Sequence, residues 1–368
     1  MSDQKIRKKT LLVFFIITPI ILAFVVGEIY IRIFKEYTTP ELLKIKSLQY
    51  VPSVFSRFVF PEKKQVTELT GKRPSYYINP RGYRGKEFNI IKDKGTIRII
   101  IYGGSAVFDI YKSEGKDWPH RIEQILKEKG LNNVEVINGG IPGHTTFDAL
   151  GRLFSDGWTL NPDYVINYEA WNDICYFTNN ITIQKYYKPY IEGEDPRISY
   201  QNTIDKLLCE TSQLYVRLRG KYYDWKYNIG IEGAAVPTSD EEMTELSLKQ
   251  YRLNLEMFVD LSRNINAVPV LITQARLVDK NNTPEEKSKI AYEYQKMNHS
   301  NLVKAFEKTD EIIKEISLKK KVNIIDPSKT MSGKSIFFKD HVHTTEEGSD
   351  QLAKIISDGL FDIISNNN

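Results

Sequence analysis

Ser105 and the pair Asp340 and His343 are the residues of this sequence best suited to nucleophilic chemistry. Ser105 follows two glycines, which allow a sharp turn that leaves its hydroxyl exposed. His343 comes three residues after Asp340, so one loop turn lets the carboxylate orient the imidazole. Thr344 and Glu347 match a capping box, which would hold His343 just before a final helix. A serine, a base and an orienting carboxylate together activate a nucleophile.

Two further loops offer hydrogen-bond donors for a tetrahedral oxyanion. Residues 138–146 (NGGIPGHTT) end before a helical pattern, where a backbone N–H can turn toward an anion with the help of the helix dipole. The loop at residues 169–173 contains Asn172, whose side-chain amide can donate to developing negative charge. The four loops together supply the groups that acyl transfer needs.

Each of these loops also has an ordinary structural interpretation. A serine, threonine or asparagine in a turn often caps a helix or closes an Asx turn, as could Ser105, Thr145, Thr146 and Asn172. The last loop could be a solvated polar segment, because it also contains His341. A zinc site at His341 and His343 would lack a third and fourth ligand at recognisable spacing. The combination of loops, rather than any single one, favours catalysis.

The loops follow an alternating pattern of strands and helices. Short β-branched runs predict strands at residues 96–102, 134–137, 163–168, 268–273 and 322–325. Helical spacing predicts helices at residues 118–129, 145–158, 240–264, 285–318 (in two pieces) and 345–364. This alternation predicts a three-layer α/β/α sandwich around one mostly parallel, five-stranded sheet. Ligand sites of such sheets lie beyond the carboxyl ends of the strands, where Ser105 and Asn172 fall.

The N-terminal segment differs from the rest of the chain. The run from Leu11 to Val26 has no charged residue, and with its continuation to Phe34 it is long enough to cross a membrane as one helix. A cluster of basic residues precedes it, which favours a cytoplasmic N-terminus and an extracytoplasmic bulk: Lys5, Arg7, Lys8 and Lys9. A cleaved signal peptide and a buried core helix are the alternatives, although no small-x-small cleavage site follows the run cleanly.

The composition limits the function classes. A chain of 368 residues with 41% hydrophobic and 27% charged residues is neither wholly disordered nor a polytopic membrane protein. A net charge of +4 is too small to favour nucleic acid as the main ligand. Cys175 and Cys209 exclude a disulfide scaffold and leave a single bridge open. We predict a cytoplasmic N-terminus (1–10), an anchor (11–34), a neck (35–75) and one catalytic domain (76–368).

Residues 176–238 form an insertion that lacks the alternating pattern and is rich in aromatic residues. Nine tyrosines occur from Tyr176 to Tyr227, together with Phe177 and Trp225. The insertion leaves the third strand beside Asn172, so it could overhang the site as a lid that binds a sugar face. The commoner use of such rings is to pack an insertion against its domain or against the membrane interface. Lysines and arginines among the tyrosines leave an anionic glycan or a lipid headgroup open as ligands.

Taken together, the four loops resemble the SGNH hydrolases, also called the GDSL esterase/lipase family. The G-D-S block appears as Gly103-Gly104-Ser105, with glycine in place of aspartate, and the second block as residues 138–143. The G-x-N-D block appears as residues 170–173, with alanine in place of glycine, and the D-x-x-H block matches in full. The resemblance covers about residues 75–363, and residues 77–85 look like the lead-in of membrane-anchored members.

The resemblance implies a role for each matching residue. Ser105 would be the nucleophile, His343 the general base and then acid, and Asp340 the carboxylate that orients His343. The oxyanion hole would consist of the backbone N–H groups of Ser105 and Gly143 and the amide of Asn172. We expect no cofactor and no metal, because no phosphate loop, dinucleotide fingerprint or metal-ligand cluster is apparent.

The leading functional hypothesis is a membrane-anchored, extracytoplasmic serine esterase. It would remove an ester-linked acyl group, with acetyl as the first candidate, from a cell-surface glycan. An O-acyltransferase acting on an envelope polysaccharide with the same triad is the nearest alternative, followed by a lipid esterase or thioesterase and by an inactive scaffold with this fold. The expected partners are an acylated small molecule or glycan and the membrane, and not nucleic acid.

Overall fold

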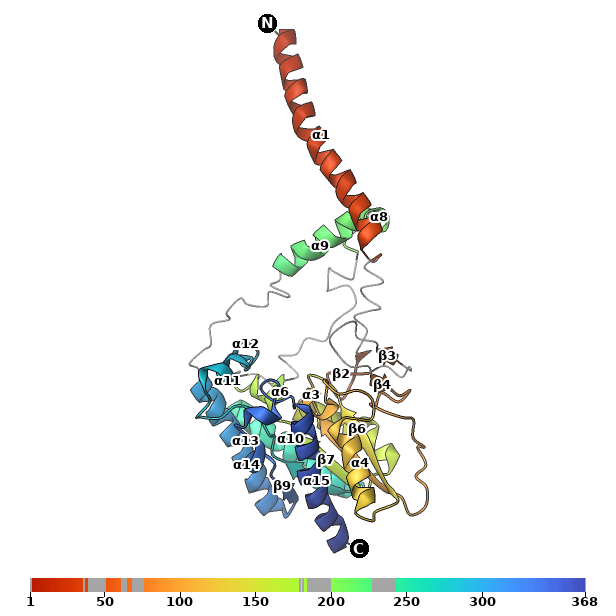
Figure 1. Cartoon of the computed structure of the whole chain (residues 1–368), viewed down its shortest axis with the longest axis vertical. Helices are drawn as coiled ribbons and strands as arrows, with labels where there is room; N and C mark the ends of the chain where they lie inside the picture. The colour runs from red at the N-terminus through yellow and green to blue at the C-terminus, as the bar shows by residue number, and fades with distance from the viewer. Residues whose placement is uncertain are drawn as a thin grey trace. The chain divides into compact units, whose positions relative to one another are not determined.

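The computed structural model describes residues 2–35, 37–38, 51–60, 65–67, 76–178, 180, 182–183, 200–226 and 243–367 (Figure 1). The chain divides into two compact units. The smaller unit comprises residues 1–49 and 190–234, and the larger unit comprises residues 50–189 and 235–368. All four loops singled out from the sequence belong to the larger unit.

Five parallel strands form the centre of the larger unit. Their order is β6–β5–β7–β8–β9, and every neighbouring pair is parallel. The strands are β5 (Ile97–Gly103), β6 (Val134–Gly140), β7 (Tyr164–Tyr168), β8 (Val268–Ile272) and β9 (Asn323–Ile325). The predicted five-stranded parallel sheet is therefore confirmed, with β6 three residues longer at its carboxyl end than the sequence pattern indicates.

Both faces of this sheet are buried. Ile99, Ile100 and Ile101 follow one another in β5 and all three are 0% exposed. Consecutive residues of a strand point to opposite faces, so each face must be covered for all three side chains to be buried. This explains why the strands read as continuous apolar runs rather than as an alternation of apolar and polar residues.

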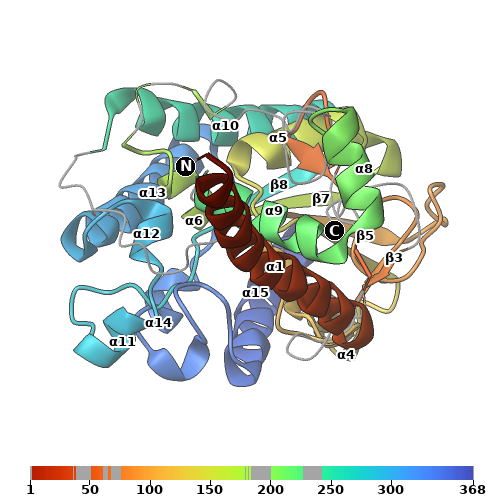
Figure 2. The same ribbon diagram turned by 90° about the horizontal axis from the view of Figure 1, so that it is seen from above.

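Helices cover the two faces of the sheet (Figure 2). On one face, α4 (Trp118–Glu128) packs against β6 and against α15 (Glu346–Asn367). On the other face, α5 (Thr146–Ser155) contacts β5, and α10 (Glu245–Asn264) contacts both α5 and β8. The helix α13 (His299–Lys320) packs against α10 and β8. The larger unit is thus the predicted three-layer α/β/α sandwich.

Short helices occupy several loops. Their bounds are α3 (Ser105–Phe108), η1 (Gly157–Leu160), α6 (Trp171–Ile174), α11 (Pro284–Ser288), α12 (Tyr292–Gln295), α14 (Ser328–Met331) and η2 (Ser335–Phe337). The stretch 285–318, expected as two helices, contains three, because Lys296 ends α12 with a left-handed φ of 55°. Asn298 then caps α13 by accepting the N–H of Asn301.

Part of the predicted neck packs on the larger unit. Two small antiparallel sheets pair β1 (Val51–Pro52) with β2 (Phe58–Val59) and β3 (Gln65–Thr67) with β4 (Tyr76–Ile78). Phe60, directly after β2, is 2% exposed. In the turn-rich segment at 77–85, the Asn79 carboxamide accepts the backbone N–H groups of Arg81 and Tyr83. These contacts bring residues from the N-terminal side of the domain close to the sheet.

The smaller unit contains α1 (Ser2–Phe34), α8 (Thr203–Thr211) and α9 (Gln213–Lys226). Within α1, Phe14–Phe34 is long and apolar enough to cross a membrane, as a signal sequence also is. Almost none of this stretch is buried, which does not fit the core helix of a soluble protein. The helices α8 and α9 lie in the insertion, where the sequence pattern predicts no regular element. The insertion's residues 184–199 and 227–238 lie outside the described residues.

The two cysteines are both free in the structure and belong to different units. Cys175 belongs to the larger unit, and its thiol donates to the backbone oxygen of Asn172 at 3.0 Å. Burial raises the pKa of this thiol to about 12, so it stays protonated at neutral pH. Cys209 is buried in the smaller unit.

Candidate active site

Ser105 is the first residue of α3, and only Gly104 separates it from the end of β5. A Cβ atom on Gly103 would lie 2.3 Å from the backbone oxygen of Tyr168, so glycine is required where β5 passes the end of β7. The single turn of α3 ends at Asp109, which takes a left-handed φ of 57°. The guanidinium of Arg84 holds this turn by donating to the backbone oxygen of Asp109 at 3.0 Å. The serine is thus fixed on a tight turn at the carboxyl end of a central strand.

Asp340, His343 and Ser105 form a continuous hydrogen-bonded chain. His343 Nε2 lies 2.7 Å from the Oγ of Ser105, and His343 Nδ1 lies 2.8 Å from the Oδ2 of Asp340. Asp340 Oδ1 also accepts the backbone N–H of His343 at 3.0 Å. The spacing of three residues therefore lets one carboxylate fix both the backbone and the ring of His343. Burial would raise the pKa of Asp340, but hydrogen bonds and charge from His343 hold it well below its usual range.

Asp109 ties the serine turn to the segment that follows His343. Its buried carboxylate accepts the hydroxyls of Ser349, at 2.8 Å, and Thr344, at 3.4 Å. The capping box expected from Thr344 and Glu347 is therefore wrong by one residue. Thr345 caps α15 instead, because its hydroxyl accepts an N–H of the first helical turn at 3.0 Å.

Gly143 lies in the tight turn that joins β6 to α5. The N–H of His144 donates to the backbone oxygen of Ile141 at 3.0 Å, which closes a four-residue turn. Pro142 occupies its second position, and Gly143, with a φ of +86°, its third. This is the residue pattern of a type II turn, in which the third residue needs a left-handed φ that glycine adopts without strain.

The Asn172 side chain is held at both ends. Its Nδ2 donates to the backbone oxygen of His144 at 2.8 Å, which links it to the Gly143 turn. Its Oδ1 accepts the hydroxyl of Tyr294 at 3.0 Å. The amide plane is therefore fixed, and the second hydrogen on Nδ2 has a defined direction.

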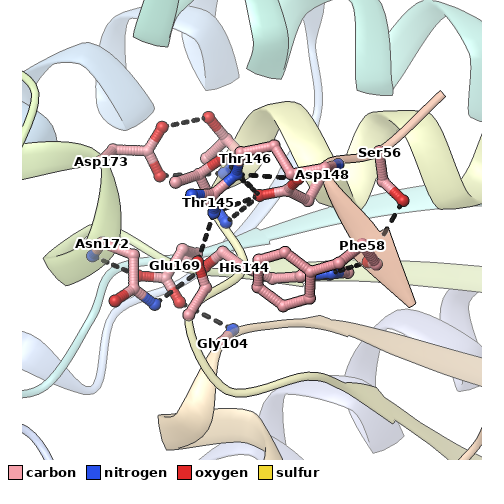
Figure 3. A network of polar contacts seen from close by, with 12 residues as sticks. Ser56, Phe58, Gly104, His144, Thr145, Thr146, Asp148, Glu169, Asn172 and Asp173 are labelled. Carbon is pink, nitrogen blue, oxygen red and sulfur yellow. Dashed lines mark hydrogen bonds and ion pairs between the residues drawn. The ribbon is translucent and has the colours of Figure 1, made fainter. Parts of the chain in front are cut away.

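Glu169 joins the serine loop to the asparagine loop (Figure 3). One carboxylate oxygen accepts the N–H of Gly104 at 2.7 Å, and the other accepts the N–H of Asn172 at 2.8 Å. A Cβ atom on Gly104 would lie 2.2 Å from Asn172 Nδ2 and 2.5 Å from Glu169 Oε2. The aspartate of a G-D-S block therefore does not fit at position 104, because Glu169 and Asn172 fill the space beside it.

A buried ion pair supports the Gly143 turn. Asp148 accepts the N–H of Thr145 and the Nη2 of Arg57, each at 2.7 Å (Figure 3 shows the contact with Thr145). The same guanidinium donates to the backbone oxygen of Gly143 and, at 2.8 Å, to the hydroxyl of Tyr176. The side chains of Arg57 and Asp148 are only 6% and 0% exposed, so the pair is rigidly enclosed.

The buried carboxyl groups differ in their charge state. Burial raises the pKa of Glu169 to about 8 and that of Asp173 to about 7. Burial would also raise the pKa of Asp148, but the neighbouring His144 and Arg57 lower it. Burial also raises the pKa of Asp109, in the serine turn, to about 6. Beside the ion pair of Arg57 and Asp148, these loops thus contain three carboxyl groups that titrate close to neutrality.

Aromatic rings surround the triad. The His341 ring stacks on Trp171 with centroids 3.8 Å apart, and Tyr294 lies parallel to Trp171 at 6.0 Å. Tyr111 stands edge-on to His343 at 5.5 Å, and its hydroxyl donates to Asp340 at 3.3 Å. Tyr294 is 45% exposed, so one ring of this group faces solvent.

In the part of the chain that the structure describes, Asp340, His341 and His343 form one group that could hold a metal ion, with ligand atoms within 4.8 Å of one another. Asp340 is thus a third ligand near the two histidines considered in the sequence. The Asp340 carboxylate is, however, bound to the His343 ring, and the other nitrogen of that ring is bound to Ser105. Burial lowers the pKa of His341 to about 4, so its stacked ring is neutral at neutral pH.

No protein-family model matches the sequence, and no curated protein matches it. The chain is similar to the solved structure of an acetyl xylan esterase named AlAXEase, with 15% sequence identity over 71% of this chain and 98% of that chain and a TM-score of 0.42. It is also similar to a lipase/acylhydrolase from Enterococcus faecalis, with 16% identity over 73% of this chain and 96% of that chain and a TM-score of 0.43. A third similar structure is a catalytic mutant of an acetylxylan esterase from Geobacillus stearothermophilus, with 13% identity over 73% of this chain and 96% of that chain and a TM-score of 0.42. The chain resembles GDSL-type acylhydrolases.

The structure brings together the residues that the sequence singled out. Ser105, His343 and Asp340 are joined directly, and Asn172 is joined to the Gly143 turn through the backbone of His144. Sequence reasoning missed other residues that hold these loops: Arg57, Asp109, Tyr111, Asp148, Glu169 and Tyr294. An acidic residue directly after an apolar strand, as Glu169 is, was a usable signal, whereas Arg57 lies in the predicted neck without any pattern around it.

Proposed function

We propose that this chain is a membrane-anchored serine esterase that removes an acyl group from a glycan outside the cytoplasm. The hydrogen-bonded chain from Ser105 through His343 to Asp340 carries the proposal, with contacts of 2.7 Å and 2.8 Å. A serine hydroxyl bound to an imidazole, which is itself oriented by an ionised carboxylate, is the arrangement that activates an alcohol for attack on an ester.

Acylation begins with proton transfer from Ser105 to Nε2 of His343. The Oγ atom of Ser105 then forms a bond to the ester carbonyl carbon, and the carbonyl electrons move to its oxygen. The tetrahedral intermediate collapses, the bond to the alcohol oxygen breaks, and His343 returns the proton to the leaving alcohol. Asp340 stays ionised and stabilises the imidazolium that exists between these two transfers.

Deacylation repeats the same steps with water. His343 takes a proton from water, the resulting hydroxide attacks the acyl carbonyl, and the proton returns to Ser105 as the acid is released. An acyltransferase would use a sugar hydroxyl in place of this water. The product therefore distinguishes the two reactions.

The oxyanion of each intermediate would be held by the second hydrogen of Asn172 Nδ2 and by the backbone N–H groups of Gly143 and Ser105. Tyr294 and His144 fix the plane of the Asn172 amide. Donors that are already oriented need no reorganisation when charge develops, which is the main source of their effect on rate.

The proposed substrate class follows from the surroundings of Ser105. Tyr294 is 45% exposed and contacts Asn172, and Tyr111 contacts Asp340. Flat amphipathic rings stack well on the apolar face of a sugar and hydrogen-bond to its hydroxyls. An acylated glycan, with acetyl as the first acyl group to test, is the substrate that fits these rings.

The proposed location follows from α1. Its apolar stretch is exposed and long enough to span a bilayer, and the basic cluster before it favours a cytoplasmic N-terminus. Protease added to intact cells should then digest the bulk of the chain. Complete protection of the chain in intact cells would contradict the extracytoplasmic location.

The activity itself is tested with the full-length protein in detergent. We expect it to hydrolyse p-nitrophenyl acetate and to release acetate from acetylated xylo-oligosaccharides. Ser105→Ala should reduce both rates by at least about 10⁴-fold, because no other group replaces the nucleophile. Ser113→Ala, a change at an exposed serine outside the triad, should leave both rates unchanged.

Two outcomes would contradict the proposal. Equal rates for the wild type and Ser105→Ala would exclude the serine mechanism. Absence of acetate release together with formation of newly acetylated oligosaccharide, when an acyl donor and an acceptor are supplied, would identify a transferase in place of an esterase.

A further inference from the structure

The helices α8 and α9 of the smaller unit pack with their polar groups inside. Asp205 of α8 and Arg219 of α9 form two hydrogen bonds of 2.7 Å each, and the Tyr215 hydroxyl donates to Asp205 at 2.8 Å. Asp205 and Arg219 are only 5% and 6% exposed. An enclosed ion pair thus lies at the contact between the two helices, in addition to the buried Cys209 and Val216, whereas a helix pair in water normally encloses mainly apolar side chains.

The apolar side chains of α8 face outward. Ile204, Leu207 and Leu208 lie on one face of the helix at the spacing of an apolar stripe, and they are 70%, 58% and 37% exposed. A separate exposed face carries the charged pair Lys206 and Glu210, whose charged atoms are 3.8 Å apart. The helix therefore has an enclosed polar face, an exposed apolar face and an exposed charged face.

The helix α9 also has an exposed apolar face. Leu214, Leu218, Tyr222 and Trp225 recur every three or four residues and so form one stripe along the helix. Leu218, Tyr222 and Trp225 are 52%, 50% and 70% exposed. A stripe of this kind that ends in tyrosine and tryptophan is typical of a helix at a membrane–water interface.

The joint between α8 and α9, which comprises residues 212–214, is bound to α1 (Figure 1). The carboxylate of Glu28 accepts the backbone N–H groups of Gln213, at 2.9 Å, and Leu214, at 2.8 Å. Arg32 donates to the same carboxylate at 2.6 Å. A Cβ atom on Gly27 would lie 3.1 Å from the Leu214 side chain, so α9 begins directly against α1.

The position of this joint along α1 corresponds to the edge of a bilayer. From Leu11, where the apolar run begins, to Glu28, the helix rises about 26 Å at about 1.5 Å per residue. The hydrocarbon core of a bilayer is about 30 Å thick. If α1 spans a membrane, Glu28 and the start of α9 lie where hydrocarbon gives way to headgroups.

We infer that the exposed apolar faces of α8 and α9 lie in the headgroup region of the membrane that α1 spans, so that a lipid surface is their partner. The inference rests on the membrane anchoring in the proposed function. It explains why polar groups are enclosed between the helices while leucine, tyrosine and tryptophan point outward. It also explains the carboxylate of Glu28 in an apolar helix, since bonds to α9 satisfy it. Apart from the enclosed Arg219, the sequence of α9 contains three basic residues and one acidic residue, a balance that suits anionic headgroups.

Tryptophan fluorescence tests the inference in the full-length protein. The protein is reconstituted into vesicles of equimolar phosphatidylcholine and phosphatidylglycerol, with or without bromine on the upper part of the acyl chains. Trp225 is 70% exposed, and Trp158 of the larger unit is 53% exposed. Brominated lipid should quench the wild type, Trp225→Phe should lose most of this quenching, and Trp158→Phe should keep it. Unchanged quenching in Trp225→Phe would overturn the inference.

Two further probes test which face meets the lipid. In the Trp225→Phe background, Leu207→Trp places a tryptophan on the apolar face of α8, and Glu210→Trp places one on its charged face. Quenching should return in the first variant and stay absent in the second. Equal quenching of the two would refute the assigned face, and no quenching in either would show that protein, not lipid, covers the pair.

Flotation of the same vesicles separates the inference from the proposals on which it depends. Protein that fails to float with the vesicles contradicts the anchor, and the inference falls with it. Protein that floats without quenching contradicts the inference alone. Hydrolysis of p-nitrophenyl acetate, measured on the same samples, reports the esterase activity independently of both results.

Discussion

Two buried arginines, Arg57 and Arg98, lie on opposite sides of the same parallel sheet. One lies at the edge formed by the carboxyl ends of the strands, and the other lies at the edge formed by their amino ends. Arg57 pairs with Asp148 at the edge where the strands end, with a shortest N–O distance of 2.7 Å. Arg98 of β5 pairs with Glu135 of β6 at the edge where the strands begin, at 2.6 Å. The two arginine side chains are 6% and 2% exposed. A buried arginine thus forms an ion pair at both edges, although Asp148 is 0% exposed and Glu135 is 29% exposed.

The two arginines differ in the backbone that they hold. Arg57 donates to the oxygen of Gly143, in the turn that also binds Asn172. Arg98 donates to the oxygens of Leu160 and Asn89, each at 2.6 Å, in segments that lead into the strands. Loops that leave the carboxyl ends of parallel strands converge on one site. The same chemistry therefore positions the candidate site at one edge and stabilises the fold at the other.

The strongest test of this comparison exchanges one carboxylate at each edge for an amide. Asp340→Asn should lower kcat by about 10⁴-fold, because the amide no longer orients and stabilises the His343 imidazolium. Asp163→Asn, where the carboxylate accepts the Arg98 N–H at 2.6 Å, should leave kcat unchanged and lower the melting temperature. Steady-state kinetics and thermal unfolding of both variants check this. A large loss of kcat in Asp163→Asn would show that the edges are not functionally separate.

The next largest effect is expected at Asn172. Asn172→Ala should reduce kcat by about 10²–10³-fold with little change in KM, because its amide would bind the oxyanion only in the transition state. Tyr294→Phe removes the hydroxyl that fixes this amide and should cost less than about tenfold, the value of one hydrogen bond. If Tyr294→Phe proved as harmful as Asn172→Ala, Tyr294 would have a direct part in the reaction.

A matched pair of substitutions tests the two arginines themselves. Arg57→Lys keeps the positive charge but removes the planar guanidinium that binds Asp148 and the Gly143 oxygen at the same time. We therefore expect kcat to decrease about tenfold. Arg98→Lys should leave kcat within about twofold and lower the melting temperature. Kinetics and thermal unfolding of both variants distinguish positioning from stability. Identical effects of the two substitutions on kcat would refute the comparison.

The smallest expected effect is a pH dependence of stability. In the folded protein the pKa values of Glu169 and Asp173 are about 8 and about 7, against 4.5 and 3.8 as their ordinary values. At pH values between the ordinary pKa and the raised pKa of each group, the folded chain keeps a proton that the unfolded chain has released. The free energy of unfolding therefore falls as the pH rises. The buried His144 and His341, whose pKa values are lowered to about 4, have the opposite effect below about pH 6.5, so the melting temperature should decrease mainly from about pH 6.5 to about pH 8. Glu169→Gln should reduce this decrease, and an equal decrease in both proteins would contradict the assignment.

The strands and the hydrogen-bonded chain of the candidate triad could be predicted from the sequence because their signals are local. The strands of a sheet covered on both faces are continuous apolar runs, which are visible in any window of the sequence. Asp340 orients His343 through a loop of four residues, so the motif contains its own geometry. Ser105 follows a strand and two glycines, which place a residue at a sheet edge in any fold of this class.

Contacts between distant parts of the chain could not be predicted in this way. Arg57 meets Asp148 across 91 positions, and Tyr294 meets Asn172 across 122. Thr344 matched the sequence motif of a capping box, but the Thr344 hydroxyl binds Asp109, which is 235 positions away in the sequence. Thr345 caps the helix instead. A local sequence motif does not form its usual contact when a buried acceptor from a distant part of the chain binds the same side chain.

By itself, the sequence determined the parallel α/β sheet, the apolar N-terminal helix and the residues of the candidate triad. The tertiary structure alone decided which buried groups hold the site in place: Glu169 beside Gly104, Arg57 on the Gly143 turn, and Tyr294 on the Asn172 amide. It also decided that α8 and α9 enclose polar groups and expose apolar ones. The physical reason is that burial and charge pairing depend on which segments meet in space, whereas hydrophobic pattern and loop spacing are properties of the chain itself.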